Sequence, residues 1–432
     1  MFWQKDIETM PRRELEALQL ERLKWTVKYC FDNVPFYNNR LTKAGVLPDK
    51  IKVLSDIQHI PFTTKDDIRD NYPFGLFAVP QKQIVRIHAS SGTTGKPTVV
   101  GYTRNDLNMW SDAVARFCVA VGVTDEDIAQ IAFGYGLFTG ALGLHNGLEK
   151  IGVSIIPMSS GNTEKQLMLM QDFGPTLLIA TPSYALFLAE SLREHDISSD
   201  KLKLRIGLFG SEGTTEKMRD ELEAGLGVFA TDNYGLSEIL GPGISGDCME
   251  RSGQHIAEDF FLPEIINSST EQVLEAGETG EVVFTTLCKE GIPLLRYRTR
   301  DLSRLNYEAC KCGRTHVRMD RIKGRSDDML KIKGVNVFPS QIESVLRDIK
   351  DVASHYLLIV RKEGYMDNLE VQVELTNNSL LDNFSQLENL QTLIRHKLQS
   401  VLGLDSKVTL VEPKTLERAQ GKSKRILDLR NK

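Results

Sequence analysis

Residues 84–102 read Ile-Val-Arg-Ile-His-Ala-Ser-Ser-Gly-Thr-Thr-Gly-Lys-Pro-Thr-Val-Val-Gly-Tyr. The alternating apolar residues of Ile84–His88 predict a strand that runs directly into a glycine loop. The β-branched residues after the loop, at 98–102, predict a second strand. A Walker phosphate loop is excluded, because Pro97 follows the lysine and a strand rather than a helix comes next.

The residues of this loop are suited to binding a polyphosphate. Gly92 and Gly95 can adopt positive φ, which lets consecutive backbone N–H groups converge on one anion. Lys96 adds a positive charge. Hydroxyl groups come from Ser90, Ser91, Thr93 and Thr94.

Downstream of the loop, short apolar runs alternate with helical stretches between residues 128 and 235. This alternation is typical of βαβ units, in which a parallel sheet carries helices on both faces. From 281 to 306 the apolar period becomes two, which predicts antiparallel strands that close the large domain. Ahead of the loop, residues 13–45 predict a helix, and Thr63–Asp67 predicts the capped start of another.

A second domain is predicted after a polar segment at 324–328. Ser340–Glu343 has the pattern of a capping box that opens a helix. Further strands are predicted at 355–361, 369–375 and 407–411, with a helix at 389–401. We therefore expect an α/β fold with a large N-terminal domain of mixed, mostly parallel sheets and flanking helices at 1–326. A small α+β domain is expected at 327–432.

The overall composition narrows the class of protein. The chain has 432 residues and a net charge of −5, from 53 basic and 58 acidic residues, which gives no basic footprint for nucleic acid. We find no apolar run of about 18 residues, the length that a membrane span needs. The first residues carry acidic side chains where a secretory signal would be apolar, and the six cysteines are too sparse for a disulfide scaffold. We expect a cytoplasmic protein in a reducing compartment.

The string Ser90–Thr98 resembles the phosphate loop of the adenylate-forming superfamily, which includes acyl-CoA synthetases, adenylation domains and luciferases. Segments that resemble its other motifs follow in the usual order, at Asp232–Glu238, Tyr297–Asp301, Gly324–Lys331 and Gln420–Arg425. The resemblance implies that ATP is bound and cleaved to AMP, and that the small C-terminal domain is mobile.

The resemblance also implies roles for single residues. In the first of these motifs the ring of Tyr234 packs on adenine, the hydroxyl of Ser237 meets the α-phosphate, and Glu238 holds Mg²⁺, a hard cation that prefers oxygen ligands. Asp232 and Gly235 complete that motif. In the later motifs, Asp301 grips the ribose hydroxyls, Arg325 lies near the ribose, Asp327 is the hinge and Lys422 is the catalytic lysine.

Four further stretches resemble one family of this superfamily, the phenylacetate–CoA ligases. They lie at 61–65, 71–75, 99–103 and 334–343, and the likeness covers essentially the whole chain. It implies a ligase that converts phenylacetate or a similar arylacetate to an acyl-adenylate with release of pyrophosphate. Coenzyme A then takes the acyl group as a thioester. Indoleacetate, hydroxyphenylacetate and benzoate-like acids stay open as substrates.

The first step needs no general base, because a carboxyl group with a pKa of about 4 is already ionised at neutral pH. Glu238 with its cation, Lys422, Lys96 and the amides of the glycine loop are suited to neutralising charge at the α-phosphorus. In the family the small domain rotates about the hinge between the two steps. We therefore expect Lys422 to serve adenylation only.

An aromatic stretch, Phe133–Phe138, alternates rings with glycines and can form a flat slot for an aryl group. By their positions in the family, Tyr135 and Phe138 line this pocket. Further lining is expected from Gly210, Ser211, Glu212 and Pro242. The family more often reads Gly-Ala-Glu-Pro where this chain has Gly-Ser-Glu-Gly, which alters the shape of the pocket.

A structural zinc site is predicted from cysteine spacing. Cys310 and Cys312 form a tight pair followed by glycine, and Cys248 and His255 lie in a polar upstream segment. Three thiolates and one imidazole complete a closed tetrahedral zinc site. His316 is the alternative fourth ligand. His255 is preferred because its segment also supplies Cys248.

Two other functions stay open at this point. A stand-alone adenylation enzyme that loads an aryl acid onto a carrier protein would use the same adenylation residues. A nucleotide-binding protein without catalysis could keep the fold, although retention of Glu238, Asp301 and Lys422 together argues against it. The expected ligands are thus an aryl acid, ATP and coenzyme A. Dimers are common among such relatives, so a homodimer stays open.

Overall fold

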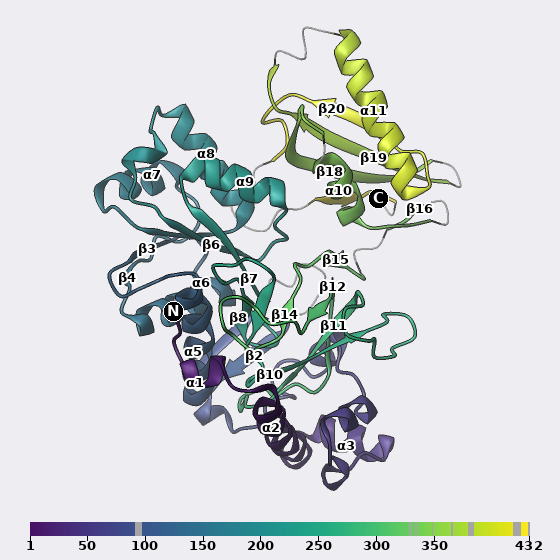
Figure 1. The fold of residues 1–432 in the computed structure, drawn as a ribbon. Coiled ribbons are helices and arrows are strands. Elements are labelled where there is room, and N and C mark those ends of the chain that lie inside the picture. The colour runs from purple at the N-terminus through teal and green to yellow at the C-terminus, as the bar shows by residue number, and fades with distance from the viewer. Residues whose placement is uncertain are drawn as a thin grey trace.

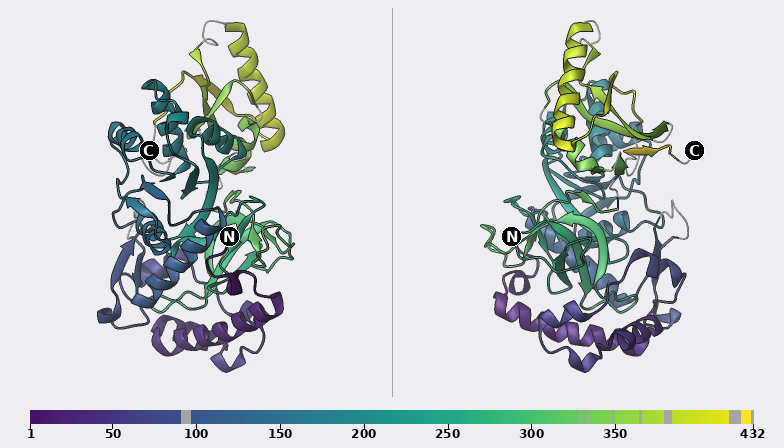
Figure 2. Two further views of the ribbon diagram at one scale, coloured as in Figure 1. Left: turned by 60° about the vertical axis from the view of Figure 1, so that its left-hand side comes forward. Right: turned by 90° about the vertical axis from the view of Figure 1, so that its right-hand side faces the viewer.

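The computed structural model describes residues 1–90, 97–327, 330–332, 335–347, 349–363, 366–378, 384–417 and 425–430. Residues 91–96, 328 and 422, which carry several of the predicted roles, lie outside these ranges. Figures 1 and 2 show the N-terminal helices at one end of the molecule and the C-terminal residues at the other. Within the described ranges, none of the helices combines the length and apolar character of a membrane span.

The first 83 residues are mainly helical, and they form part of the main hydrophobic core. The helix predicted at 13–45 is in fact two helices, because Val34 adopts an extended conformation before Pro35. A residue before proline avoids the α region, and proline cannot donate an N–H to the preceding turn. The elements are α1 (Lys5–Glu8), α2 (Arg12–Asn33), α3 (Pro35–Ala44), η1 (Pro48–Lys50), η2 (Leu54–His59), α4 (Lys65–Asp70) and η3 (Gln81–Gln83).

The start predicted at Thr63–Asp67 is confirmed, with Thr64 as the N-cap of α4. Its side chain accepts a hydrogen bond from Asp67 N, and the Asp67 carboxylate accepts one from Thr64 N. The two strands that flank the glycine loop are also confirmed. Strands β1 (Arg86–Ala89) and β2 (Val99–Tyr102) pair in antiparallel register, with Ala89 opposite Val99.

The large sheet has the strand order β13-β14-β9-β8-β7-β6-β5-β3-β4. From β4 to β7 neighbouring strands are parallel, and from β7 to β13 they are antiparallel. The strands are β3 (Ile128–Ile131), β4 (Ser154–Ile156), β5 (Leu177–Ala180), β6 (Ile206–Gly210), β7 (Phe229–Leu236), β8 (Gly241–Gly246), β9 (Gln254–Ile256), β13 (Leu305–Asn306) and β14 (Arg318–Met319). The predicted βαβ alternation over 128–235 is thereby confirmed.

Helices cover both faces of this sheet. Along β5, Leu177 and Ile179 belong to the main core, whereas Leu178 and Ala180 belong to a second cluster on the other face. This division follows from the two-residue period of a strand. On the main-core face lie α5 (Arg104–Ala120) and α6 (Thr139–Ile151), and on the other lie α7 (Thr163–Asp172), α8 (Pro182–Glu194) and α9 (Glu216–Leu226).

The antiparallel strands predicted at 281–306 form a smaller sheet with the order β10-β11-β12-β15. Every pair in it is antiparallel, as the period-two pattern indicated. Its strands are β10 (Phe261–Ile266), β11 (Gly280–Thr286), β12 (Tyr297–Ser303) and β15 (Gly324–Arg325).

The C-terminal residues form a separate α+β unit with its own hydrophobic cluster between Leu330 and Val408. Its main sheet has the order β20-β19-β18-β21, and its first helix begins at Pro339, one residue before the cap predicted at Ser340. Proline suits a first helical position because its φ is already helical. The elements are β16 (Leu330–Ile332), β17 (Val335–Val337), α10 (Pro339–Arg347), β18 (Val352–Glu363), β19 (Met366–Leu375), α11 (Phe384–Leu402), β20 (Lys407–Val411) and β21 (Ile426–Asp428).

This unit lies against helix α9 of the large sheet. Lys217 Nζ donates to Val352 O at 2.5 Å, and Ser354 Oγ donates to Glu221 Oε2 at 2.7 Å. Both bonds join α9 to the first residues of β18. They therefore depend on the orientation of the C-terminal unit.

Candidate active site

The candidate site lies where the parallel strands β3, β5, β6 and β7 end at one edge of the large sheet. Ligands of open α/β sheets bind outside these carboxyl ends. Two side-chain contacts join the segments there. Thr139 Oγ1 lies 2.9 Å from Ser237 Oγ, and Thr98 Oγ1 donates to Glu238 Oε1 at 3.3 Å.

Asp301, the residue expected to bind ribose, accepts hydrogen bonds from two predicted site residues. Tyr234 OH donates to its Oδ2 at 2.6 Å, and Arg325 Nη1 lies 3.1 Å from its Oδ1. The pairing of β12 with β15 places Arg325 directly opposite Asp301. Arg325 also forms two bonds, of 2.8 and 2.9 Å, to the predicted hinge residue Asp327. Burial, together with the Asp301 charge, raises the pKa of Tyr234, so its hydroxyl stays a donor.

Glu238 is a buried carboxylate in the turn after β7, with 5% of its surface exposed. Besides the hydroxyl of Thr98, the ammonium of Lys65 lies 3.4 Å from its Oε1. Lys65 is the first residue of α4, directly after the cap. Hydroxyl and carboxylate oxygens at this point fit Mg²⁺, which proteins usually hold through one or two carboxylates together with substrate phosphates.

The ends of the glycine loop are fixed to each other. Ser90 N donates to Thr98 O, and Thr98 N donates to Ser90 Oγ, both at 3.0 Å. The predicted phosphate-binding residues Ser91, Gly92, Thr93, Thr94, Gly95 and Lys96 lie outside the described residues.

Gly235 and Asp232, two further residues of the Asp232–Glu238 motif, are constrained by neighbouring residues. A Cβ at Gly235 would lie 1.9 Å from Gly241 O, so the β7–β8 hairpin requires glycine there. Asp232 is buried beside Asp247, whose Oδ2 accepts from Asp232 N at 3.0 Å. Burial and the charge of Asp247 raise the pKa of Asp232 to about 7.

Lys422 also lies outside the described residues, but Arg425 shows where the chain re-enters the described part. Its backbone carbonyl accepts from Leu358 N at 2.9 Å, and its guanidinium donates to Glu343 at 2.8 Å. The same guanidinium lies 3.8 Å from Met218 Sδ on α9. The residue that closes the Gln420–Arg425 motif is thus held between the small sheet and α9.

The predicted acyl-pocket residues come from the loops at the same edge of the large sheet. Tyr135 OH lies 3.0 Å from His145 Nδ1, and Phe138 is 42% exposed. Glu212 Oε2 accepts from Ser183 Oγ at 2.5 Å. Of the others, Gly210 ends β6 beside β7, Ser211 follows with φ of 71°, and Pro242 is buried with its carbonyl bound to Trp110 Nε1 at 2.8 Å.

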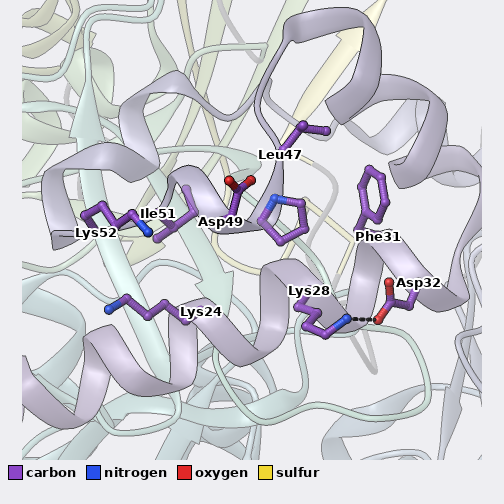
Figure 3. A pocket seen from close by; sticks show the side chains of 9 residues that line it. Lys24, Lys28, Phe31, Asp32, Leu47, Asp49, Ile51 and Lys52 are labelled. Carbon is purple, nitrogen blue, oxygen red and sulfur yellow. Dashed lines mark hydrogen bonds and ion pairs between the residues drawn. The ribbon is translucent and has the colours of Figure 1, made fainter.

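A cavity of about 620 Å³ lies away from this edge, between α2 and the η1 turn (Figure 3). Lysines and apolar side chains line it, and Lys28 pairs with Asp32 across 2.6 Å. The lining residues are Lys24, Lys28, Phe31, Asp32, Leu47, Pro48, Asp49, Ile51 and Lys52. It belongs to the N-terminal helices and not to the strand ends that gather the predicted motifs.

The four predicted zinc ligands come together at another place. The ligand atoms of Cys248, His255, Cys310 and Cys312 all lie within 4.8 Å of one another. Cys248 Sγ lies 3.8 Å from Cys310 Sγ, and Cys312 Sγ lies 3.3 Å from His255 Nε2. Tetrahedral zinc with bonds of about 2.3 Å to sulfur separates two thiolates by about 3.8 Å, so the donor set fits this metal.

The second nitrogen of His255 is also suitably bound. Its Nδ1 lies 3.1 Å from His316 O, which leaves Nε2 facing the thiols. A backbone carbonyl that fixes the tautomer is a common partner of a metal-binding histidine. The alternative ligand His316 lies outside the cluster.

Two lysines of the site were not among the residues selected from the sequence. Lys65 contacts Glu238 from the start of α4, and Lys289 donates to main-chain carbonyls of the turn that carries Glu238. The cap at Thr64 placed Lys65 at a helix start, but no local pattern indicated what it would contact. For Lys289 the sequence offers only a lysine between two strands.

Comparison with known proteins places the chain in a family. The sequence-family model for AMP-binding enzymes matches residues 18–287. The family model for the AMP-binding enzyme C-terminal domain matches residues 334–430. Four curated relatives match over nearly their full length. The chain is 49% identical to the phenylacetate–coenzyme A ligase of Thermus thermophilus, with 100% of both chains covered. It is 50% identical to that of Escherichia coli, covering 98% of this chain and 97% of the relative.

Solved structures agree with this assignment. The 2-hydroxyisobutyryl-CoA ligase in the postadenylation state with 2-HIB-AMP superposes with a TM-score of 0.92, at 28% identity over 99% of this chain and 92% of that one. The same ligase with 2-HIB-AMP and CoA in the thioesterification state gives 0.74, at 28% identity over 100% and 93%. The relative orientation of the two domains in this chain therefore matches the neighbour's postadenylation state better than its thioesterification state.

The fold and the residues at the strand ends define an AMP-binding enzyme of the adenylate-forming superfamily. Within this class, the chain belongs to the phenylacetate–coenzyme A ligase family.

The bond between Tyr234 and Asp301 leads to a prediction for nucleotide binding. Tyr234→Phe removes a hydrogen bond to a buried charge, and such bonds contribute about 1.5–3 kcal/mol. We expect AMP to bind at least about tenfold more weakly, as measured by calorimetry on the full chain. Tyr184→Phe, which removes a hydroxyl bonded to Gly161 O, is the matched control and should leave AMP affinity unchanged. Equal AMP affinity in Tyr234→Phe and wild type would show that this bond does not organise the site.

Proposed function

We propose that the protein is an ATP-dependent acid–thiol ligase that activates phenylacetate, or a similar arylacetate, and transfers the acyl group to coenzyme A. The observation that carries this proposal is the likeness to four phenylacetate–coenzyme A ligases, at 46–50% identity over 98–100% of the chain. Coenzyme A is therefore favoured over a carrier protein as the final acceptor. Free cysteines throughout the chain suit a reducing compartment, which supports a cytoplasmic location.

In the first half-reaction, an ionised carboxylate attacks the α-phosphorus of ATP, and pyrophosphate leaves. Tyr234, Asp301 and Arg325 orient the adenosine half. Ser90 and the loop after it bind the phosphates, while Lys65 and Lys422 supply positive charge near them. Glu238 and Thr98 would hold Mg²⁺, which neutralises phosphate charge when bound. This work is electrostatic and positional.

The aryl group of the acid is assigned to the slot formed by the loops after β3 and β6. Tyr135 and Phe138 supply aromatic walls, and Gly210, Ser211, Glu212 and Pro242 complete the lining. The bond from His145 fixes the hydroxyl of Tyr135. Thr139 joins this loop to the turn after β7 through its contact with Ser237, and we assign the ionised carboxylate of the acid to the side of the slot that faces this turn.

For the second half-reaction, we assign residues 1–326 to a fixed domain and 327–432 to a lid that turns about Asp327. The support is the difference between TM-scores of 0.92 and 0.74 to the two states of the neighbouring ligase. Rotation would break the bonds of Lys217 and Ser354 between α9 and β18. It would also withdraw Lys422 and open a path for the coenzyme A thiol to the acyl-adenylate.

The function is tested by following AMP, pyrophosphate and thioester with ATP, Mg²⁺ and a panel of aryl acids, with and without coenzyme A. We expect AMP and phenylacetyl-CoA in equal amounts. Without coenzyme A, pyrophosphate release should stop near one turnover, when the acyl-adenylate stays bound. Indoleacetate, hydroxyphenylacetate and benzoate are compared by kcat/KM. Pyrophosphate release that does not depend on any acid would end the proposal.

The division of labour between half-reactions gives a second test. Lys422→Ala should lower acid-dependent pyrophosphate release by about 10²-fold or more, because it removes positive charge from the transition state. Thioester formation from supplied phenylacetyl-adenylate and coenzyme A should persist near the wild-type rate. Lys424→Ala, two residues away in the same segment, is the control and should affect neither step strongly. Equal loss of both half-reactions in Lys422→Ala would contradict the assignment.

We assign structural zinc to the Cys248, His255, Cys310 and Cys312 cluster. Protein purified without chelator should contain about one zinc per chain by elemental analysis, and Cys312→Ser should lose most of it. Cys118→Ser replaces a buried thiol in α5 outside the cluster and should retain the metal. Wild-type protein without stoichiometric zinc would exclude this site.

A further inference from the structure

The turn that carries Glu238, Ser237–Leu240 between β7 and β8, has its main-chain carbonyls bound by two side chains. Lys289 Nζ donates to Glu238 O at 3.1 Å and to Ile239 O at 2.6 Å. Tyr102 OH donates to Leu240 O at 2.8 Å and lies 3.4 Å from Ser237 O. Each carbonyl oxygen of the turn therefore faces one of these two donors.

Lys289 is an unusual residue to find at this place, because it is 0% exposed. A buried ammonium loses several kcal/mol of hydration unless other groups replace the water. Here both hydrogen-bond acceptors are main-chain carbonyls, and the ring centroid of Tyr102 lies 5.2 Å from Nζ. Tyr102 is itself stacked on Trp110, with 5.0 Å between centroids. Burial lowers the pKa of Lys289 to about 8, and the charges of Asp106 and Glu238 oppose that shift.

The segment that carries Lys289 is anchored to helix α5. Asp106 accepts from Glu290 N at 2.7 Å and from Gly291 N at 2.8 Å, and it also accepts from Thr103 N at the helix start. The two residues that follow Lys289 are thus fixed to the same helix start that follows β2. This anchoring holds the Lys289 ammonium against the main-chain carbonyls of the turn.

The carboxylate of Glu238 contacts Thr98 and Lys65. Within the turn itself, Ile239 N and Leu240 N share the carbonyl of Leu236, at 3.1 and 3.0 Å. The direction of the Glu238 carboxylate therefore depends on how Lys289 and Tyr102 hold the backbone of this turn.

We infer that Lys289, together with Tyr102, is a positioning residue that fixes the Glu238 carboxylate for the divalent cation accompanying ATP. This inference rests on the proposed function, in which that carboxylate meets the cation. The pair is fully buried and binds main-chain carbonyls of the turn. It acts through the backbone of the turn.

The experiment measures nucleotide binding to the full chain by calorimetry, without acid or coenzyme A. ATP is titrated with and without Mg²⁺, and AMP is titrated separately. Lys289→Met keeps the length of the side chain but cannot donate to the carbonyls. We expect ATP affinity in Mg²⁺ to fall by about tenfold or more, as for other residues that support a metal ligand. AMP affinity should stay within about twofold, because Tyr234 and Asp301 are untouched.

A milder variant and a control make the outcome specific. Tyr102→Phe removes only the hydroxyl, and we expect a loss of about threefold to tenfold in Mg²⁺·ATP affinity with unchanged AMP affinity. If Lys289→Met does not fold, the Tyr102→Phe variant alone tests the positioning role. Tyr184→Phe removes another buried hydroxyl, bonded to Gly161 O at 3.2 Å, and should leave both affinities unchanged.

Two results would overturn the inference: wild-type Mg²⁺·ATP affinity in a folded variant, or a parallel loss of AMP binding. The second would mean that the pair only stabilises the fold. Neither result depends on turnover. A failure of acid activation in the wild-type protein, which would refute the proposed function, is therefore seen separately.

Discussion

The parallel run of β3, β5, β6 and β7 is the constraint on which the candidate site depends. Once these strands share one hydrogen-bond ladder, the loops that follow them must leave the sheet at the same edge. Thr139 and Ser237 are 98 positions apart in sequence, yet their hydroxyl oxygens lie 2.9 Å apart. The aromatic stretch at 133–138 and the Asp232–Glu238 motif are neighbours for this reason.

The second theme is the pairing of buried charge across distant segments. Asp301 has Tyr234 and Arg325, and Glu238 has Lys65 and Thr98. A buried carboxylate without such partners would lose several kcal/mol of hydration or take up a proton. The donors also orient each carboxylate in advance, which would reduce the reorganisation needed to bind a nucleotide at the proposed site. The ammonium of Lys289 extends this principle to the backbone behind Glu238.

The Cys/His cluster and the C-terminal unit lie outside the strands that form this edge of the sheet, and different contacts hold each of them. In the Cys/His cluster, Cys248, two residues after the end of β8, lies beside Cys310, 62 positions later. The C-terminal unit has its own core and meets α9 through polar bonds such as that of Ser354 with Glu221. A unit with a separate core and a polar interface can change its orientation without unfolding.

The sequence by itself determined the parts of the protein that depend on local pattern. The two strands within 84–102, the alternating elements over 128–235 and the capped helix start at Thr63–Asp67 follow from periodicity and backbone preference, and the structure has each of them. The extent of the helix over 13–45 was wrong, although the proline at 35 was a readable signal. The motif residues Glu238, Asp301 and Arg325 were selected from resemblance, and the predicted members of the metal cluster from spacing and composition.

Only the tertiary structure decided which of these residues meet. It placed His255 rather than His316 among the thiols, with the Nδ1 of His255 bound to the His316 carbonyl. It also brought Lys65 beside the carboxylate of Glu238 and Lys289 beside the main-chain carbonyl of the same residue. Such contacts depend on strand register and on the packing of segments far apart in the chain. Local sequence patterns report backbone preferences, and they carry no information about those distances.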